Sequence, residues 1–542
     1  MISLFYKYSK IISKLHKIVF LLLLMLIVST GSIRVLAITN NTAADSSNTK
    51  YSLNYSSFFG GISDDSINDI AVDNEGSIYI TGRTASPDFP VIDPYNSTTP
   101  TLTFQSAFVA KFDQNGHLLF SRYLGGSGLD LGYGITVDNN HNFYVIGDTR
   151  SSDFPILNAY QSTNTNSSLF LTKFNPDGQM NYSTFLGGTG YDSGKEVAVD
   201  QSGNIYVCGH SNSDNFNIKS AFQTTRSGDY DSIVAKFDKD GTLVFSTYYG
   251  GDKDDSCQGL TIDPNGNIYI SGDSLSSNLP LAGNSYQTSK AGNSVDSFYA
   301  EFDPQGNLTY ATYLGETYQE SNYGIEVDLT GNVYLAGATQ SDNFTVTSDA
   351  YNKTFSGIWD IYLTKFSSNN SLSYSTYVGG NGNDIPYGFT LDNSGNIYLA
   401  GYTGSTNFPV VNAYNDTNSG SNDVFITKFS SDFTLEYSTY FGSSGWEVGN
   451  AITIDHSGNI ILGGVTNSDE FPTAYAFDAT RGGSYEGFIV KFNNLNSAID
   501  GSNEDLLAEF QTLLSNQIFV VVFGIAIISV LINLISLFRR RR

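Results

Sequence analysis

Short runs of apolar and alternating residues follow one another along this chain, and each run is bounded by Gly, Asn, Asp or Ser. The runs are rich in valine, isoleucine, threonine, tyrosine and phenylalanine, and they are too short for typical helices, so the pattern predicts strands. Between residues 384 and 441 we predict four strands, named a to d in chain order, at 388–392, 396–402, 423–429 and 434–441.

The same order of strands recurs along the chain at an almost constant interval. A glycine directly after strand d marks each unit, and successive marking glycines are 62 to 65 residues apart. They are Gly60, Gly125, Gly187, Gly250, Gly315, Gly379 and Gly442. Four short strands in each of seven regular units predict an all-β fold, a seven-bladed β-propeller with four-stranded antiparallel blades.

The two ends of the repeat array are out of phase with each other. A lone d-type strand at 54–59 precedes the first complete unit, and the last unit stops after a c-type strand at 487–492. We therefore expect the N-terminal strand to complete the last blade and close the ring, which places the propeller at residues 54–492.

The motifs of each unit keep a fixed order. A STYLGG-like strand end is followed about five positions later by an acidic residue, and then by segments similar to VDxxGNIYVxG, SxDFP and FVAKF. In this combination the chain resembles the seven-bladed β-propeller repeat family known as the SBBP repeat, over residues 54–492. The resemblance implies the propeller fold and an exported or surface protein of bacteria or archaea, and it implies no particular activity.

The N-terminal residues have the layout of an export signal. Four lysines, an apolar run at 18–28 and small residues near Ala37 predict a signal peptide at 1–37, with an uncleaved anchor as the alternative. Residues 38–53 form a short N-terminal segment between this signal and the repeats.

The C-terminal residues predict a membrane anchor. Residues 518–538 are uncharged and long enough to cross a bilayer as one transmembrane helix, and the four arginines of 539–542 predict a cytoplasmic basic tail. Residues 493–517 are expected to form a juxtamembrane linker or helix. Together the termini predict a single-pass protein of the cell membrane, with its propeller on the extracytoplasmic side.

The charge of the chain limits its expected partners, and its cysteine content limits its possible disulfides. The chain has 53 acidic and 27 basic residues and a net charge of −26, which excludes nucleic acid as a partner because phosphate binding needs a basic face. The expected partners are the membrane, through the C-terminal span, and a surface protein or a glycan. The two cysteines, Cys208 and Cys257, are too few for a disulfide framework, and both a single disulfide and two buried thiols stay open.

Export would also permit N-glycosylation at Asn-x-Ser/Thr sequences. The candidate acceptors are Asn96, Asn166, Asn343, Asn352 and Asn415.

An acidic residue five positions after each marking glycine is the first candidate for a binding site. These residues are Asp65, Asp130, Asp192, Asp255, Glu320, Asp384 and Glu447. Each lies in the d–a link just before strand a, so a propeller would place all seven around the mouth of its central channel. A ring of carboxylates attracts cations, and oxygen ligands suit Ca²⁺ or Mg²⁺. The structural alternative is that each carboxylate accepts backbone N–H bonds and fixes the joint between two blades.

The connections between strands differ on the two faces of the predicted ring. The a–b and c–d links are tight turns, whereas the b–c links run to about 17 to 24 residues. Long loops carry function more often than tight turns, so we expect the face with the b–c links to bind.

Catalytic motifs are absent from the sequence: no GxSxG, HExxH or paired-cysteine pattern occurs. The sequence therefore favours a non-catalytic cell-surface binding or scaffold protein that presents the propeller to a protein, a glycan or a cation such as Ca²⁺, with no catalytic residue assigned. The alternative is an extracytoplasmic polysaccharide-acting enzyme, a hydrolase or lyase that uses carboxylates at the channel mouth. Specificity is expected where one blade differs from its neighbours.

Overall fold

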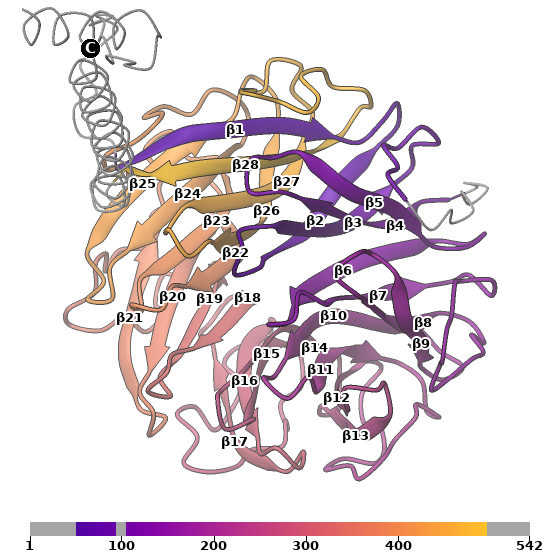
Figure 1. The fold of residues 1–542 in the computed structure, drawn as a ribbon. Coiled ribbons are helices and arrows are strands. Elements are labelled where there is room, and N and C mark those ends of the chain that lie inside the picture. Colours follow the sequence, from indigo (N-terminus) through magenta and orange to yellow (C-terminus); the bar gives the residue numbers. More distant parts are fainter. Residues whose placement is uncertain (1–49, 94–103, 496–542) are drawn as a thin grey trace, which may run out of the picture. The chain divides into compact units, whose positions relative to one another are not determined.

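The computed structural model describes residues 50–93 and 104–495, whose strands form seven separate four-stranded antiparallel sheets (Figure 1). This confirms the all-β seven-bladed propeller. The predicted signal peptide, the predicted transmembrane helix at 518–538 and the basic tail lie outside the described residues, as does Asn96. Within the described part, no helix is long and apolar enough to cross a membrane.

Each blade contains strands a to d in that spatial order, and blades 1 to 7 begin with successive strands a. Strands a are β2 (Asp65–Val72), β6 (Asp130–Val137), β10 (Asp192–Val199), β14 (Asp255–Ile262), β18 (Glu320–Val327), β22 (Asp384–Leu391) and β26 (Glu447–Ile454). Strands b are β3 (Ile78–Thr84), β7 (Phe143–Thr149), β11 (Ile205–Ser211), β15 (Ile268–Ser274), β19 (Val333–Thr339), β23 (Ile397–Thr403) and β27 (Ile460–Thr466). Strands c are β4 (Ser106–Phe112), β8 (Ser168–Phe174), β12 (Asp231–Phe237), β16 (Asp296–Phe302), β20 (Asp360–Phe366), β24 (Asp423–Phe429) and β28 (Glu486–Asn494). Strands d are β5 (Leu118–Leu124), β9 (Met180–Leu186), β13 (Leu243–Tyr249), β17 (Leu308–Leu314), β21 (Leu372–Val378), β25 (Leu435–Phe441) and β1 (Tyr51–Phe59).

Strands a form the inner wall of the ring, because each packs against the strand a of the blade before it and the blade after it. In blade 6 strand a begins at Asp384, four residues before the predicted start at Gly388. A β-bulge explains the difference. The register between strands a and b shifts around one residue in every blade, Tyr387 in β22, and this extra residue breaks the period-two alternation on which the prediction rested.

The N-terminal strand closes the ring as predicted. β1 pairs antiparallel with β28, with Ser56 opposite Val490, so the last sheet has the order β1-β28-β27-β26. The backbone N–H of Leu495 donates to the carbonyl oxygen of Lys50 at 2.9 Å. The chain therefore enters and leaves the propeller side by side, at the face that carries the a–b and c–d turns.

The hydrophobic core lies between blades and is made mainly by strands b and c. In one cluster Tyr206 of β11 packs with Phe298 and Phe302 of β16, and all three are at most 1% exposed. Burial on both faces of a sheet explains why these strands read as nearly continuous apolar runs. The hydroxyl of Tyr206 also donates to Asp200 in the a–b turn at 3.0 Å, which ties the strand to its own hairpin.

The long b–c links have a structural role that their length did not predict. In blade 2, Leu157 and Gln161 pair with Ser183 and Phe185 of strand d, so the link covers the outer edge of the sheet. In blades 2 to 6 an aromatic residue of the link then packs against the end of strand c in the next blade. Such ring pairs are Tyr160–Phe237, Phe222–Phe302, Tyr286–Phe366, Tyr351–Phe429 and Tyr414–Phe492.

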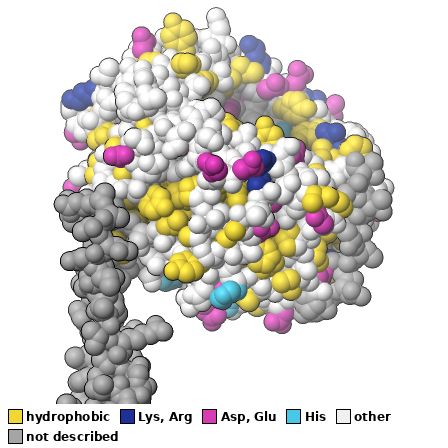
Figure 2. Space-filling view, turned by 90° about the horizontal axis from the view of Figure 1, so that it is seen from above, with side chains coloured by type: hydrophobic (Ala, Val, Ile, Leu, Met, Phe, Trp, Pro, Cys, Tyr) yellow, Lys and Arg dark blue, Asp and Glu magenta, His cyan; other side chains and the backbone are white. Residues whose placement is uncertain are grey.

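The outer surface is mostly uncharged and polar. On the face shown in Figure 2, acidic side chains are scattered among uncharged ones, and lysines and arginines are few. No basic patch gathers on this view of the described residues, in line with the net charge of −26.

Cys208 and Cys257 form a disulfide, with Cα atoms 6.1 Å apart. Of the two alternatives left open by the sequence, the structure shows the paired one. The bond joins strand b of blade 3 to strand a of blade 4 and links residues 49 positions apart in sequence. Structural disulfides persist in oxidising compartments, which agrees with the expectation of export.

Removing this disulfide should weaken the ring at that joint. In a Cys208→Ala/Cys257→Ala variant of the full chain, we expect the free energy of unfolding to fall by about 2–4 kcal/mol, because the cross-link restricts the unfolded chain. Denaturant titration with and without reductant measures the change. Reduced wild-type protein should behave like the variant, and equal stability in both redox states would contradict the prediction.

Candidate functional site in the central channel

The seven carboxylates predicted from the repeat are the first residues of strands a, and each is at most 1% exposed. Asp384 shows the common arrangement: its carboxylate accepts hydrogen bonds from the backbone N–H of Gly380 at 2.7 Å and from the hydroxyls of Thr403 and Ser405. Equivalent donors hold the other six, except that Asp65 and Glu320 each have one hydroxyl donor instead of two and Asp65 Oδ1 accepts no hydrogen bond. This geometry fits the structural alternative and gives no support to an open ring of ligand-binding carboxylates.

A second buried acid stands beside the first at five of the seven joints between blades. It is the first residue of strand c in the preceding blade, and the other two joints have Ser106 or Ser168 at this position. The pairs are Asp231 with Asp255, Asp296 with Glu320, Asp360 with Asp384, Asp423 with Glu447, and Glu486 with Asp65.

Burial raises the pKa of all ten paired carboxyls, and the neighbouring acid adds to the shift in each pair. The pKa rises to about 6 for Asp360 and to about 7 for Glu486. At Asp296 burial likewise raises the pKa to about 7. Several of these carboxyls therefore hold a proton in the folded protein near neutral pH.

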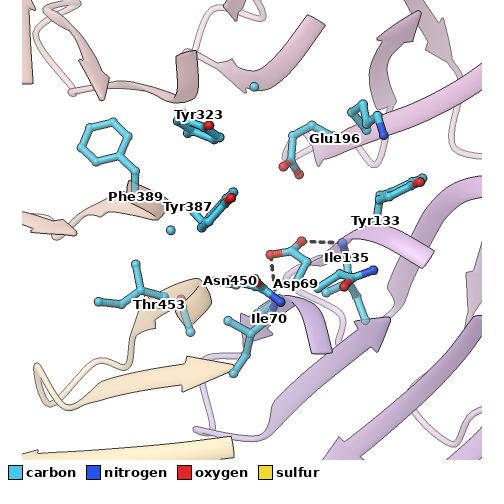
Figure 3. A pocket seen from close by; sticks show the side chains of 18 of the residues that line it. Asp69, Ile70, Tyr133, Ile135, Glu196, Tyr323, Tyr387, Phe389, Asn450 and Thr453 are labelled. Carbon is cyan, nitrogen blue, oxygen red and sulfur yellow. Dashed lines mark hydrogen bonds between the residues drawn. The ribbon is translucent and has the colours of Figure 1, made fainter. Parts of the chain in front are cut away.

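The strands a enclose a central cavity of about 780 Å³, shown from close by in Figure 3. The bulge residue of every blade lines this cavity, so seven equivalent positions contribute to its wall. They are three tyrosines, three side-chain amides and one lysine: Tyr133, Tyr323, Tyr387, Asn68, Gln258, Asn450 and Lys195. The bulge position thus has the same place in the backbone of every blade, but its side chain differs around the channel.

Two carboxylates enter the cavity directly after the bulge, at Asp69 in blade 1 and Glu196 in blade 3. A third, Glu326 of blade 5, lies two residues further along its strand. In Figure 3 the carboxyl groups of Asp69 and Glu196 point toward each other. The position of Asp69 and Glu196 is occupied in the other five blades by Gly134, Gly259, Gly324, Gly388 and Ala451.

The sequence prediction missed these three acids because it looked for residues shared by all repeats. The signal was present in the sequence as an outlier: a carboxylate where the aligned repeats have glycine, alanine or threonine. In blade 2 the glycine has a packing reason, since a Cβ on Gly134 would lie 2.9 Å from the carbonyl oxygen of Lys195. Asp69 and Glu196 therefore replace a residue whose usual role is to let neighbouring strands approach.

The two acids are held differently. Asp69 accepts from the backbone N–H of Ile70 and from that of Ile135 in the next blade, both at 2.7 Å. Glu196 accepts at one oxygen from the N–H of Val197 at 3.0 Å. Burial raises the pKa of Asp69 despite its two hydrogen bonds, and burial together with the charge of Asp69 raises the pKa of Glu196 well above its usual range. The pair can therefore hold one proton between two carboxyls near neutral pH.

The end of the cavity nearer the d–a links is aromatic and basic. The rings of Tyr323 and Tyr387 meet edge to face with centroids 5.0 Å apart, and Tyr387 keeps 39% of its surface exposed. Trp446, in the link before β26, lines the same cavity. A positive charge lies nearby, since Lys195 Nζ is 3.6 Å from the centroid of the Tyr133 ring. This end offers aromatic faces next to hydrogen-bond donors and acceptors.

Fold and channel together define a seven-bladed β-propeller with a polar, partly aromatic central cavity. A family model described as a β-propeller repeat, SBBP, matches residues 54–90, 119–155, 181–217, 244–280 and 373–409. These five matches bear out the resemblance to SBBP β-propeller repeats that the motifs indicated.

Curated relatives match at low identity. The regulatory protein FlaEY of Caulobacter vibrioides is 25% identical over 317 residues, which cover 54% of this chain and 32% of that protein. An uncharacterized WD repeat-containing protein, L264, of Acanthamoeba polyphaga mimivirus is 22% identical over 479 residues, 78% of this chain and 31% of that protein. The chain thus spans about a third of the length of these two relatives.

Solved structures match at low identity and low TM-score. A polysaccharide lyase, the ulvan lyase PL25, has 10% identity and a TM-score of 0.40, covering 75% of this chain and 93% of its own. A structure titled YCF48 bound to D1 peptide has 8% identity and a TM-score of 0.38, with coverage of 82% and 95%. A puromycin hydrolase mutant has 9% identity and a TM-score of 0.38, with coverage of 74% and 50%. These likenesses carry no argument about activity.

The predicted glycosylation sites within the described residues lie in the b–c links. Asn166 and Asn343 are exposed, whereas Asn352 and Asn415 are half-buried. The side-chain amides of all four donate hydrogen bonds within the protein. Use of these sites stays a prediction.

The paired carboxyls predict an unusual dependence of stability on pH. Their folded-state pKa values lie above the ordinary ones, so the stability they provide is present at acid pH and is lost as the pH rises through about 6 to 7. The aspartates of the a–b turns have the opposite effect on the pH dependence of stability. Burial tends to raise the pKa of Asp200, but hydrogen bonds from the Asn204 side chain and backbone outweigh it and lower that pKa, so this stability is lost below about pH 4.

We therefore expect the melting temperature of the full chain, measured in EDTA, to be highest near pH 4 and to fall as the pH rises from there to about 7. Thermal unfolding across this range measures the profile. Glu486→Gln, which keeps the size of the side chain but cannot titrate, should flatten the fall. A melting temperature that increases steadily from pH 5 to pH 8 would contradict the prediction.

Proposed function

We propose that the protein is a non-catalytic binding module that takes a glycan into the aromatic end of its central channel. The observation that carries the proposal is the difference among the seven bulge positions. A purely structural ring needs the same residue in each blade, as at Asp384 and its six equivalents, whereas the bulge positions hold tyrosine, amide and lysine side chains. Variation of chemistry on a constant backbone is what a ligand site requires.

The chemistry of the wall suits a polyhydroxylated ligand. Aromatic rings such as Tyr387 and Trp446 can pack against the C–H faces of a sugar, and the amides of Asn68 and Gln258 can donate to and accept from its hydroxyls. The cavity volume of about 780 Å³ falls in the range of small-ligand sites, so the end of a glycan chain fits it better than a folded protein surface.

Display at a cell surface is part of the proposal. The disulfide suits an exported protein. Because the chain leaves at Leu495 from the face of the tight turns, an anchor at 518–538 would leave the opposite face, with Trp446 near its channel mouth, directed away from the membrane. The expected orientation has the C-terminus in the cytoplasm.

Loss of the aromatic wall should weaken glycan binding. We expect Tyr387→Ala and Trp446→Ala each to lower affinity about tenfold or more, equivalent to at least about 1.4 kcal/mol, because buried aromatic anchors dominate small interfaces. A glycan array probed with the full chain in detergent, followed by calorimetry with the strongest oligosaccharide, measures this. Tyr475→Ala is the matched control, since Tyr475 is 92% exposed on a b–c link. Equal affinity in all variants would contradict the proposal.

A second candidate function rests on the Asp69–Glu196 pair. Two carboxyls that face each other in a cavity, with pKa values raised by burial and mutual repulsion, could act as general acid and general base on a polysaccharide. An extracytoplasmic polysaccharide hydrolase or lyase would use the same channel and the same glycan. The two functions differ only in whether the bound chain is cleaved.

Reducing-end release from glycans that bind on the array separates the two functions. An enzyme should lose activity about 100-fold or more in Glu196→Gln and in Asp69→Asn while keeping glycan affinity, because each change removes one proton-transfer group. Binding without release by wild-type protein rules out hydrolase or lyase action on that glycan and leaves the binding module.

A further inference from the structure

The joint between blades 6 and 7 holds two carboxylates that border one small space. Asp423 and Glu447 are both 0% exposed. A methyl group placed on Gly442 would lie 2.6 Å from Glu447 Oε2 and 3.0 Å from Asp423 Oδ1. Both carboxylates therefore pack against the Cα of the marking glycine of this unit, which brings their oxygens close together at the joint.

The joint between blades 5 and 6 repeats the arrangement. A methyl group on Gly379 would lie 2.7 Å from Asp360 Oδ1 and 2.9 Å from Asp384 Oδ2. A backbone carbonyl joins them, because a methyl group on Gly357 would lie 2.9 Å from the same Asp360 Oδ1 and 3.0 Å from the carbonyl oxygen of Gly380. Carboxylate and carbonyl oxygens thus gather at this joint, where Asp384 Oδ2 also accepts from the N–H of Gly380 and the hydroxyl of Ser405.

One oxygen at each of these joints has no hydrogen-bond partner of ordinary geometry among the described residues. Asp360 Oδ2 accepts from the N–H of Ser356 at 2.8 Å, and Asp423 Oδ2 from that of Ser419 at 2.9 Å. Their Oδ1 atoms are fully buried and have no hydrogen bond of ordinary geometry, although the N–H groups of Gly357 and Gly420 lie close enough to lower the pKa of these acids. No ion pair of the described residues involves either acid. A buried anionic oxygen without a partner is strongly unfavourable unless a cation or a proton completes it.

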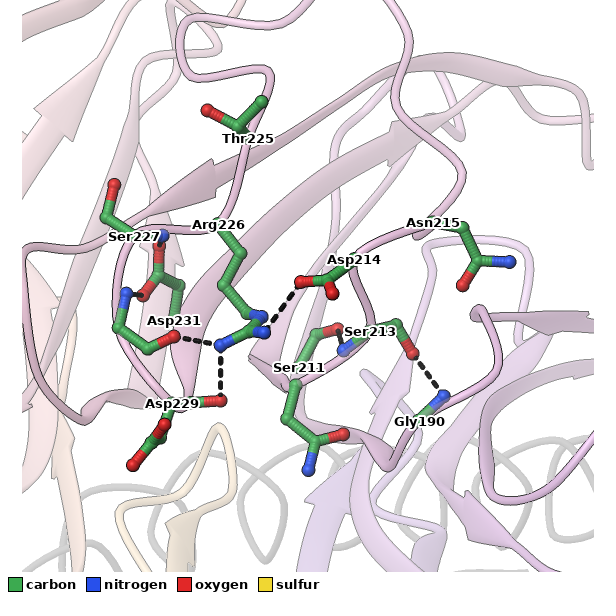
Figure 4. Close-up of polar contacts among 12 residues, drawn as sticks. Gly190, Ser211, Ser213, Asp214, Asn215, Thr225, Arg226, Ser227, Asp229 and Asp231 are labelled. Carbon is green, nitrogen blue, oxygen red and sulfur yellow. Dashed lines mark hydrogen bonds and ion pairs between the residues drawn. The ribbon is translucent and has the colours of Figure 1, made fainter.

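The other acid pairs show how a basic side chain can compensate buried negative charge. In the joint between blades 4 and 5, Lys290 reaches in from the b–c link, and its Nζ lies 3.8 Å from Asp296 Oδ1 with the lysine side chain only 6% exposed. Blade 3 places Arg226 at the same link position, beside Asp231 (Figure 4), where its charge lowers the otherwise raised pKa of that acid. Blade 7 has Arg481 there.

Blades 5 and 6 depart from this pattern. Four residues after the link aromatic they have Phe355 and Asn418, so their acid pairs receive no basic side chain from the link. The joints that follow blades 1 and 2 contain no acid pair, because Ser106 and Ser168 replace the second acid. Among the five acid pairs, those of Asp360 and Asp423 have no basic residue at this link position, and each has a buried oxygen without a hydrogen bond. Asp296 and Asp65 also have such an oxygen, but their links carry Lys290 and Arg481.

We propose that Ca²⁺ occupies these two joints, bound by Asp360 and Asp384 in one and by Asp423 and Glu447 in the other. The donors are carboxylate and carbonyl oxygens, the ligands that Ca²⁺ takes, and the looser geometry of Ca²⁺ suits a site whose donors come from two blades. In these two joints the cation supplies the positive charge that Lys290 supplies between blades 4 and 5. It also links consecutive blades. The sites are independent of any ligand in the central channel.

Tryptophan positions make the proposal directly measurable. Trp359 and Trp446 are the two tryptophans of the chain, and they immediately precede Asp360 and Glu447. Tb³⁺ replaces Ca²⁺ at oxygen sites and emits when a neighbouring tryptophan is excited. The full chain in detergent at pH 7.5 should show sensitised Tb³⁺ emission that Ca²⁺ displaces, and Ca²⁺ should raise its melting temperature over EDTA by about 3 °C or more.

Asparagine variants locate the ions. Asp360→Asn/Asp423→Asn should abolish both the emission and the Ca²⁺-dependent rise, and each single variant should remove part of them. Asp296→Asn is the matched control, because Lys290 already occupies that joint, and it should leave both signals unchanged. The single variants keep the test valid if the double variant fails to fold. Emission or a Ca²⁺ effect that persists in the asparagine variants would overturn the proposal. So would a wild-type chain that is stabilised by acid but not by Ca²⁺, which would mean that a proton fills the pair.

Discussion

The propeller depends on the buried carboxylate that begins each strand a. Through Gly380, Thr403 and Ser405, Asp384 ties the d–a link, the end of strand b and the start of the b–c link to a single point. A buried anion is tolerated only when its oxygens are satisfied, so this one interaction forces the same local geometry in all seven units. The ring closes because every joint is built alike, and β1 supplies the one strand that the last blade lacks.

This constraint leaves the inner wall free to vary. Each bulge pushes one side chain of strand a into the channel, where its identity differs from blade to blade. Asn68 and Asn450 also donate to backbone carbonyl oxygens of the next blade. Tyr387 and Lys195 are equivalent in the fold and different in chemistry. Where a carboxylate replaces the glycine that follows the bulge, as at Asp69, the channel gains charge without loss of the strand pairing.

Prediction from sequence succeeded where the signal was local or repeated. The c strand at 423–429 and the closing of the ring followed from periodicity and from the phase of the two ends. The start of strand a was missed because a bulge breaks alternation. The proximity of Asp360 and Asp384 could not be read from the chain, since it arises from packing between blades, and the role of Asp69 was hidden because it belongs to a single repeat. Shared residues indicated the fold, whereas the candidate site lies among residues that the repeats do not share.

A structure of the full chain bound to the glycan it captures would test the central claim, that the channel and not the outer links binds ligand. The account predicts sugar rings against Tyr387 and Trp446, with hydroxyls within hydrogen-bond distance of the amides of the bulge positions. A glycan lying along the b–c links, with the channel unchanged, would contradict it.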